Sequence, residues 1–244
     1  MSNIELKQVS MVLLDISGYT SFIKWHEMSL LHAEQIISEL LESAIGSLDG
    51  LLTLNKLEGD AAFLYTEVDE LNTTIPKEII EKVNNSFERF NTLQKKLIGS
   101  GEGGCPCEAC CKIDQLKLKA VLHHGEVAIK RLRQFEELAG KDVIIIHRLL
   151  KNSIDKNEYI LITDDFYKLS GSGTYGEPDI RTEHCEGIGN VKVIALYPET
   201  DELNMPESKR VRKFTGFVES MRLWRKTLFK RVTKSTPGYK NLPK

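Results

Sequence analysis

The chain has 244 residues, of which 41% are hydrophobic and 28% are charged, the composition of an ordinary globular protein that can bury one large core. No stretch is long and apolar enough to span a membrane, and the first ten residues lack the pattern of a secretory signal, so we expect a cytoplasmic protein. The net charge of −2 is unevenly distributed, because residues 209–244 hold 12 basic residues and one acidic residue. The remaining residues are acidic as a whole, and we expect the two parts to have different partners.

A buried strand is expected over residues 6–15, where an apolar run ends at Asp15. Asp15 can cap the helix that follows, or it can hold a metal ion at the end of the strand. An apolar stripe at helical spacing then predicts a helix over 29–48. Residues 51–57 and 60–68 are predicted to form two strands joined by a tight turn.

The second half of the chain continues this alternation. A helix is expected over 76–98, because Pro76 suits a first helical turn and apolar residues recur at helical spacing. A long strand over 116–132 is expected to be bent or broken near Gly125. The next elements are a helix over 142–154, a strand and a helix within 159–170, and two short strands over 180–184 and 191–196. This order predicts an α+β sandwich with a mostly antiparallel sheet flanked by helices.

Three segments carry polar residues at positions suited to chemistry. They are LLDISGYTSF with Asp15, NKLEGDAAFLY with Lys56 and Asp60, and LKAVLHHGEV followed by AGKDVIIIHRLL with Arg148. In order and spacing the three segments resemble the catalytic domain of class III nucleotidyl cyclases, the adenylate and guanylate cyclases, over about residues 6–198. The resemblance implies a ferredoxin-like sandwich of the nucleotidyl cyclase type and the conversion of ATP to cyclic AMP and pyrophosphate.

The resemblance also implies a metal site. Asp15 and Asp60 would be its two carboxylates, and the main-chain carbonyl of Ile16 would be a further ligand. Two Mg²⁺ or Mn²⁺ ions would be held in each site. The residue types suit this role independently, because Mg²⁺ takes hard oxygen ligands and keeps places for water and phosphate oxygens.

Three further residues correspond to the family's substrate-binding positions. Lys56 would recognise adenine, which favours ATP over GTP, although an exposed strand lysine is the simpler explanation. Glu137 falls where the family has a residue that contacts the adenine amino group. Arg148 corresponds to the arginine that stabilises the transition state, and the alternative for it is a surface arginine on a helix.

Two positions depart from the family pattern. The family usually has an asparagine where this chain has Ile144, and a phosphate-binding lysine where it has Ile188. Lys192 or the basic tail could replace the missing positive charge. The alternative function is therefore a catalytically degenerate module that binds nucleotide or metal as a sensor or scaffold. Sites in this family lie between two subunits, so a chain with both halves of the site predicts a homodimer.

Four of the five cysteines lie together in CPCEACC, at Cys105, Cys107, Cys110 and Cys111. Thiolates at this spacing can bind Zn²⁺ as a structural metal, and a redox switch or unliganded loop cysteines are the alternatives. A third functional hypothesis follows, a metal-binding interaction protein that shares only its fold with the cyclases. The neighbouring His123 and His124 are expected to be a packed strand pair rather than ligands.

The domain organisation expected is a cyclase-like domain over 1–199 with a cysteine-rich insertion at 100–113, a linker over 200–208 and a basic segment over 209–244. The basic segment has the pattern of an amphipathic helix. It suits an anionic membrane surface, which would make the protein membrane-peripheral, or docking onto the acidic body. No specific nucleic-acid module is present.

Overall fold

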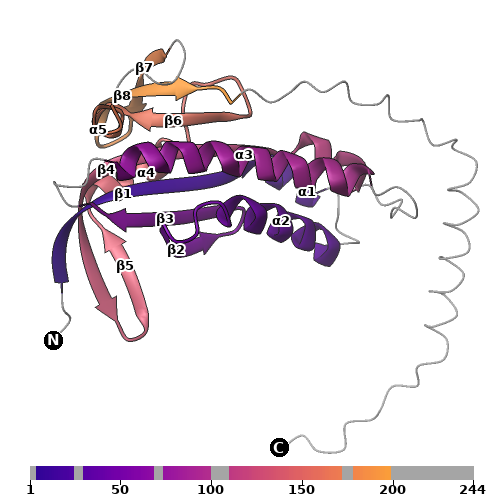
Figure 1. Cartoon of the computed structure of the whole chain (residues 1–244), viewed down its shortest axis with the longest axis horizontal. Coiled ribbons are helices and arrows are strands. Elements are labelled where there is room, and N and C mark those ends of the chain that lie inside the picture. Colours follow the sequence, from indigo (N-terminus) through magenta and orange to yellow (C-terminus); the bar gives the residue numbers. More distant parts are fainter. Residues whose placement is uncertain (1–3, 25–29, 69–73, 100–109, 172–177, 199–244) are drawn as a thin grey trace, which may run out of the picture. The chain divides into compact units, whose positions relative to one another are not determined.

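In the computed structural model the residues described are 4–24, 30–68, 74–99, 110–171 and 178–198 (Figure 1). Within these ranges the chain forms strands β1–β8, helices α1–α5 and a short 3₁₀ helix, η1. Their bounds, in chain order, are β1 Ile4–Ser17, α1 Tyr19–Lys24, α2 Leu30–Ile45, β2 Thr53–Glu58, β3 Ala61–Glu67, α3 Ile75–Gly99, η1 Cys110–Gln115, β4 Lys117–Leu132, β5 Phe135–Ala139, α4 Lys141–Arg148, β6 Tyr159–Thr163, α5 Asp164–Leu169, β7 Asp179–Cys185 and β8 Gly189–Leu196.

The strands form one sheet in the order β2-β3-β1-β4-β6-β8-β7, and β5 pairs with the far end of β4. Neighbouring strands are antiparallel except β4 and β6, which are parallel. The α+β fold with a mostly antiparallel sheet, predicted from the sequence, is confirmed. The central strand β1 lies between β3 and β4, so residues of three strands that are distant in sequence become neighbours around it.

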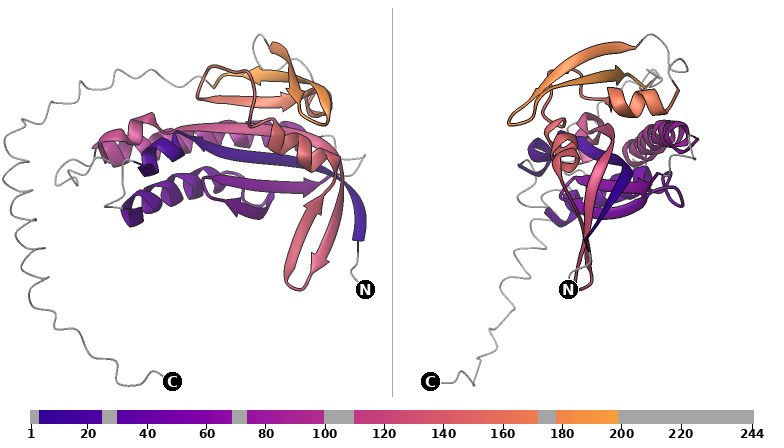
Figure 2. Two further views of the ribbon diagram at one scale, coloured as in Figure 1. Left: turned by 180° about the vertical axis from the view of Figure 1, so that it is seen from behind. Right: turned by 90° about the vertical axis from the view of Figure 1, so that its left-hand side faces the viewer.

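The two faces of the sheet bury two separate apolar clusters, and Figure 2 shows helices on both sides of the sheet. Side chains of a strand point alternately to opposite faces. Val12 and Leu14 of β1 therefore pack in the cluster with α2 and α3, whereas Met11 and Leu13 pack in the cluster with α4. Asp15 continues the second series and lies on the α4 face.

Helices α2 and α3 form because apolar residues recur at helical spacing and meet the sheet on one side. In α3 the residues Ile79, Val83, Phe87 and Phe90 are almost completely buried. Burial of such side chains stabilises the fold by about 1.5–3 kcal/mol each. Pro76 occupies the first turn of α3, where its missing N–H costs no hydrogen bond.

Of the bend or break predicted near Gly125, the break was wrong. Strand β4 runs without interruption through that residue, which pairs with Val9 of β1. A Cβ atom at Gly125 would lie 2.3 Å from Cγ of Asp142. The glycine is present because the α4 side chain approaches the strand backbone closely, which is one of the reasons for glycine inside a strand.

Strand β5 was not predicted from the sequence. It forms a hairpin with β4 in which Leu132 pairs with Phe135, and the hairpin extends away from the helices (Figure 1). Both of these apolar side chains are more than half exposed. The hairpin therefore carries an apolar tip that is available for contact with another surface.

Several predictions concern segments outside the described residues. Cys105, Cys107, the linker and the basic segment over 209–244 all belong to this group. Cys110 and Cys111 begin η1, which immediately precedes β4. Zinc binding by the cysteine cluster and the amphipathic tail helix remain predictions. None of the helices in the described ranges is long and apolar enough to cross a membrane.

Candidate functional site

The β1–β3 pairing brings Asp15 and Asp60 together. Asp15 lies opposite Ala61 in the antiparallel register, and Asp60 is the residue before Ala61, in the turn between β2 and β3. Gly59 adopts a φ of 65° in this turn, a conformation that favours glycine. The backbone N–H of Ile16 donates to the carbonyl of Asp60 at 3.2 Å. This bond fixes the turn against the end of β1.

Burial and neighbouring negative charge destabilise the charged forms of both carboxylates. The pKa of Asp15 is raised to about 6, first by burial and then by the negative charge of Asp60. The pKa of Asp60 is also raised, again chiefly by burial, with a contribution from the charge of Glu34. Perturbation of this kind is common at functional sites, because burial and like charges are expensive unless a ligand compensates them.

Two neighbouring groups modify the charge of the pair. Lys119 of β4 lies opposite Asp15 in the register, and its positive charge lowers the pKa of both aspartates. The Lys119 ammonium is 5.7 Å from the ring centroid of Tyr159. On the other side Tyr19 donates a hydrogen bond of 2.8 Å to Glu34 of α2. Three carboxylates and one ammonium thus share the region.

A divalent cation suits the charges of this arrangement. Two carboxylates without a salt bridge to a described residue supply hard oxygen ligands, and a cation would remove their repulsion. No group of three or more His, Cys, Asp or Glu side chains is arranged to hold a metal ion in the part of the chain that the structure describes. Asp15 and Asp60 therefore fit a cation that takes its other oxygen ligands from the main chain, water or substrate.

Lys56 lies on the α4 face of β2, opposite Phe63 of β3. Its ammonium forms an ion pair of 2.5 Å with Glu58, and it is 5.9 Å from the ring centroid of Phe63. The other oxygen of Glu58 is 3.6 Å from Nδ1 of His147 in α4. Lys56 is thus half-exposed and already has a carboxylate partner.

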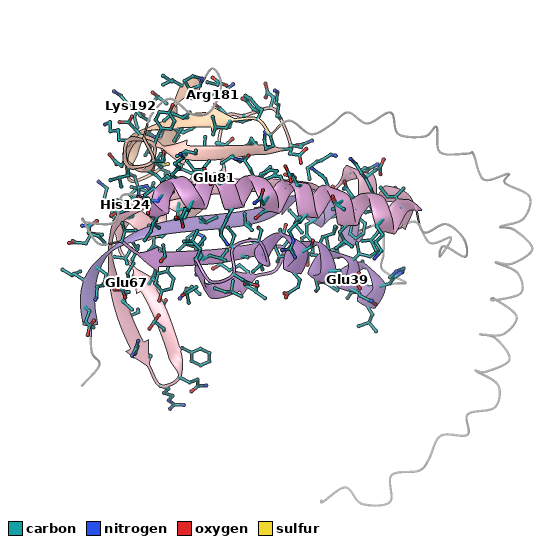
Figure 3. All side chains as sticks on the ribbon, in the orientation of Figure 1. Glu39, Glu67, Glu81, His124, Arg181 and Lys192 are labelled. Atoms are coloured by element: carbon teal, nitrogen blue, oxygen red, sulfur yellow. The ribbon has the colours of Figure 1, made fainter. Side chains whose placement is uncertain are left out.

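Arg148 ends α4 and also has an acidic partner. Its guanidinium donates to Glu186 at 3.2 Å. Glu186 belongs to the β7–β8 turn, the segment in which the sequence comparison placed Ile188 at a lysine position. Ile188 packs against the apolar cluster on the α4 face, and Ile144 is 48% exposed. Lys192, labelled in Figure 3, is exposed on β8.

Glu137 lies on β5 of the β4–β5 hairpin, opposite Lys130 of β4. It forms an ion pair of 3.1 Å with Lys130 of β4. Its neighbour Glu136 accepts a bond from Tyr65, and the Asn55 side chain donates to the Glu136 carbonyl at 3.1 Å. These contacts connect β5 to β2 and β3, so Glu137 is on the side of the molecule that carries Lys56.

The two strand histidines have structural contacts. His123 is 2% exposed and bonds to Thr163 at 2.9 Å and to Asp142 at 3.1 Å. His124, labelled in Figure 3, points to the other side and bonds to Ser10 at 3.2 Å. The prediction that this pair is packed within the sheet is confirmed.

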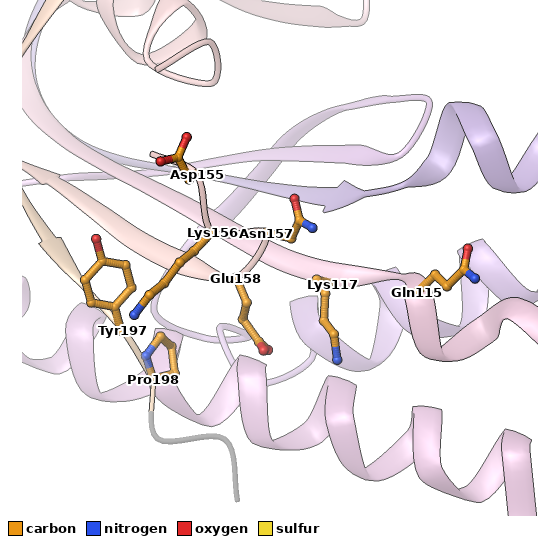
Figure 4. Close-up of a pocket in the computed structure, with 8 residues that line it drawn as sticks. All are labelled: Gln115, Lys117, Asp155, Lys156, Asn157, Glu158, Tyr197 and Pro198. Atoms are coloured by element: carbon orange, nitrogen blue, oxygen red, sulfur yellow. The ribbon is translucent and has the colours of Figure 1, made fainter. Parts of the chain in front are cut away.

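A surface cavity of about 560 Å³ lies beside the start of β4 (Figure 4). Its lining includes two lysines and two acidic residues, so it has no strong net charge. The ammonium of Lys156 lies 3.6 Å from the ring centroid of Tyr197 and occupies the face of that ring. The lining residues are Gln115, Lys117, Asp155, Lys156, Asn157, Glu158, Tyr197 and Pro198. None of them is a residue predicted from the sequence to form the site.

Sequence reasoning missed Lys119, Glu58 and Glu186, and it did not find the contact between His147 and Glu58. Glu58 and Lys56 are two positions apart on one strand, so alternation alone could have placed both side chains on one face. Lys119 could have been noticed as a charge within a buried strand. The contacts of His147 and Glu186 depend on how α4 docks on the sheet, and no local pattern announces them.

Comparisons of the sequence with known proteins assign the chain to a family. The model of a protein family described as "Protein of unknown function (DUF2652)" matches residues 37–159. The uncharacterized protein Rv2561/Rv2562 of Mycobacterium tuberculosis is 32% identical over 182 residues, which cover 75% of this chain and 82% of that protein.

Two solved structures show the same fold at low sequence identity. The adenylyl cyclase CyaB from P. aeruginosa is 14% identical with a TM-score of 0.62, over 82% of this chain and 99% of that one. The guanylate cyclase domain of RhGC from Catenaria anguillulae, in complex with GTP, is 15% identical with a TM-score of 0.57, over 80% and 100% of the two chains. The chain belongs to the DUF2652 family, and its fold is that of the adenylyl and guanylyl cyclase domains.

Proposed function

We propose that this protein is a nucleotidyl cyclase that converts ATP to cyclic AMP and pyrophosphate. In this reaction the ribose 3′-oxygen attacks the α-phosphorus, the hydroxyl proton passes to water, and the bond from the α-phosphorus to the departing pyrophosphate breaks. The observation that carries the proposal is the pair Asp15 and Asp60, held together by the β1–β3 register of a cyclase fold while their charges repel.

Asp15 and Asp60 would hold Mg²⁺ or Mn²⁺, with the Ile16 carbonyl as a further ligand. When bound, the metal would lower the pKa of the 3′-hydroxyl and neutralise charge on the triphosphate. The two carboxylates are suited to this role because burial and neighbouring negative charge destabilise their charged forms, and a bound cation would offset that cost. Lys119, whose charge acts on both carboxylates, would add a positive charge beside the triphosphate.

Lys56, Glu137 and Arg148 would bind the rest of the substrate. Lys56 would donate to the adenine ring, and Glu137 would accept from the adenine amino group. Arg148 would stabilise the charge that develops on the α-phosphate. A substrate must displace Glu186 from Arg148, an exposed pair of the kind that costs little to separate.

The site is proposed to be shared by two copies of the chain. Glu137 and Arg148 are engaged with other residues of their own chain rather than with the carboxylate pair. A second copy could bring its Lys56 and Arg148 to the Asp15–Asp60 pair of the first. The exposed apolar residues Leu132 and Phe135 at the hairpin tip provide a surface that a partner could cover. A homodimer would then contain two equivalent sites.

A second function is favoured by the substituted positions. Ile144 supplies no hydrogen-bonding side chain, and Ile188 packs against the core where a phosphate-binding lysine was expected. Glu186 neutralises Arg148 in addition. These residues favour a module that binds nucleotide or a divalent cation as a sensor or scaffold without turning the nucleotide over. Metal binding by the cysteine cluster and contact of the tail with an anionic membrane or the acidic body remain separate proposals.

One assay separates the two functions. The purified full-length chain is incubated with ATP and Mn²⁺, and cyclic AMP is measured for the wild type, Asp15→Ala and Asp60→Ala. A cyclase loses at least about 100-fold of its rate in either variant, because the cation that polarises the substrate is no longer held. Asp49→Asn, an exposed change away from the pair, serves as the matched control. If the wild type forms no more cyclic AMP than the variants, catalysis is excluded and the binding module remains.

A further inference from the structure

Lys56, Glu58 and His147 form a row of polar groups on the α4 face of the sheet. Lys56 and Glu58 are two residues apart on β2 and lie opposite Phe63 and Ala61 of β3. Both β3 residues belong to the apolar cluster beneath α4. The row therefore lies on buried apolar residues. The side chains of Lys56 and Glu58 remain 42% and 41% exposed. A ligand can reach them.

The two oxygens of Glu58 have different partners. Oε1 is 2.5 Å from the Lys56 ammonium, and Oε2 is 3.6 Å from Nδ1 of His147. The imidazole is held in place by Phe63, whose ring centroid is 5.2 Å from that of His147. Oε2 is thus covered by a ring that is packed against the core, whereas Oε1 is covered only by a flexible lysine.

The buried nitrogen of His147 decides which side of the ring carries the proton. Its Nε2 is buried and has no hydrogen-bond partner among the described residues. A buried N–H without an acceptor is costly, so in the neutral ring the proton belongs on Nδ1, where it faces Glu58. Burial also lowers the pKa of His147. The neutral ring therefore directs a donor at Oε2 and leaves Oε1 beside the Lys56 donor.

We propose, building on the function proposed above, that Glu58 accepts from the adenine amino group together with Lys56, and that His147 excludes guanine by covering the second Glu58 oxygen. Adenine offers a ring-nitrogen acceptor next to an amino donor. The Lys56 ammonium can donate to the ring nitrogen, and Glu58 Oε1, which keeps a second lone pair beside its ion pair with Lys56, can accept from the amino group. Glu58 thereby takes the part that the family resemblance gives to Glu137, which is ion-paired to Lys130 on the hairpin.

Guanine makes a different demand on the same residues. Its Watson–Crick edge carries two adjacent N–H donors beside a carbonyl, and a carboxylate satisfies both donors only when both of its oxygens are free. The His147 ring lies 3.6 Å from Oε2, so we place it where the second guanine donor would have to approach. A guanine would leave one donor unpaired on binding, which is the strongest basis for rejection between similar ligands. His147 acts through Glu58 and is a positioning residue.

The test measures the equilibrium binding of 3′-deoxy-ATP and 3′-deoxy-GTP, which lack the attacking hydroxyl and cannot cyclise. The full-length chain is titrated by calorimetry in the presence of Mg²⁺, as wild type, His147→Ala and Glu58→Ala. In His147→Ala the affinity for the guanine nucleotide should rise about tenfold, with the adenine nucleotide unchanged within about twofold. In Glu58→Ala the affinity for the adenine nucleotide should fall about tenfold. His184→Ala, an exposed histidine on β7, is the control.

The two proposals fail in different ways. If the wild type binds the adenine nucleotide and Asp15→Asn abolishes binding, while the adenine-to-guanine ratio stays constant in His147→Ala and Glu58→Ala, the recognition proposal alone is overturned. An equal loss of affinity for both nucleotides in His147→Ala also overturns the recognition proposal. Damage to the fold would lower both affinities without changing the adenine-to-guanine ratio. If the wild type binds neither nucleotide, the proposed function falls and the recognition proposal falls with it.

Discussion

The acidic and basic residues of the candidate site are in opposite electrostatic situations. Asp15 and Asp60 repel each other, form no salt bridge with a described residue, and have raised pKa values. Lys56 and Arg148 each hold a carboxylate of their own chain, at 2.5 Å and 3.2 Å. The acidic pair thus has no salt-bridge partner among the described residues, whereas each of the two basic residues already has an acidic partner.

This difference shows where binding energy must come from. Compensation of two half-buried carboxylates of like charge is favourable for any divalent cation with places for oxygen ligands. Release of an exposed ion pair changes the free energy by only about 0–1 kcal/mol. The account therefore predicts large effects from changes in the acidic pair and small effects from changes in the partners of the basic residues.

The largest effect is expected from recombining the two regions in a mixed dimer. Asp60→Asn and Arg148→Ala should each lose at least about 100-fold of the cyclase rate. Equal amounts of the two variants, unfolded and refolded together, should recover about a quarter of the wild-type rate. The reason is that half of the dimers are mixed and one of their two sites is intact. Cyclic AMP formation measures the recovery. No recovery in a demonstrated mixed dimer would show that the two regions do not share a site.

Helix α4, which carries Arg148, is held against the sheet by contacts near Gly125. Among substitutions at these contacts, Gly125→Ala should destabilise the fold most. The new Cβ would lie 2.3 Å from Cγ of Asp142, which bonds to His123 and to the backbone N–H of Glu126. Displacement of this carboxylate loosens α4 and should lower the free energy of unfolding by about 2–4 kcal/mol. Urea denaturation measures the loss. Gly46→Ala separates the clash from the general cost of replacing a glycine, because Gly46 has no positive φ and its new Cβ would meet nothing nearer than the end of the flexible Arg89 side chain, at 3.1 Å.

The acidic region should give the apoprotein a distinctive pH dependence. The pKa of Asp15 is raised from 3.8 to about 6 in the folded state, so its contribution to stability is fully present below pH 3.8 and is lost as the pH rises through about 6. In the presence of a chelator this amounts to about 2 kcal/mol, allowing for partial solvent exposure. Asp15→Asn should lack this loss. Urea titrations from pH 4 to pH 7.5 measure it, and identical slopes in the two proteins would contradict the repulsion.

The smallest effect is expected in the basic region. Glu186→Gln releases Arg148 from its carboxylate partner, and both side chains are exposed. Affinity for 3′-deoxy-ATP should therefore rise only about twofold to fivefold. Calorimetry at low and at physiological salt measures this change, which screening should reduce. A decrease in affinity would show that Glu186 assists the arginine rather than competing with the phosphate.

The periodicity of apolar residues and the spacing of motifs were sufficient to predict most of the fold from the sequence. Apolar stripes at helical spacing gave α2 and α3, and the Gly59–Asp60 turn gave the β2–β3 hairpin. Strand β5 was missed because its five residues include two adjacent glutamates and one buried side chain, Leu138. The continuity of β4 was missed because glycine usually interrupts a strand, and the reason for Gly125 lies in α4.

The candidate site was predictable only in part, because some of its residues follow local patterns and others are brought together only by the fold. Asp15 and Asp60 could be found because each stands beside a glycine turn at a strand end, which is a local pattern. Their neighbour Lys119 comes from a strand about sixty residues away and is brought in by the sheet register. The ion-pair partners of Lys56 and Arg148 depend on side-chain packing, for which the spacing of residues gives no information.

The most direct test of the account is the titration of Mn²⁺ into the full-length chain with 3′-deoxy-ATP present, followed by the electron paramagnetic resonance signal of free Mn²⁺. The wild type and the control Asp49→Asn should bind the ion alike. Asp15→Asn and Asp60→Asn should each weaken its binding by at least about tenfold, because each removes one of two carboxylate ligands. Equal Mn²⁺ affinity in the wild type and in either variant would contradict a cation shared by Asp15 and Asp60.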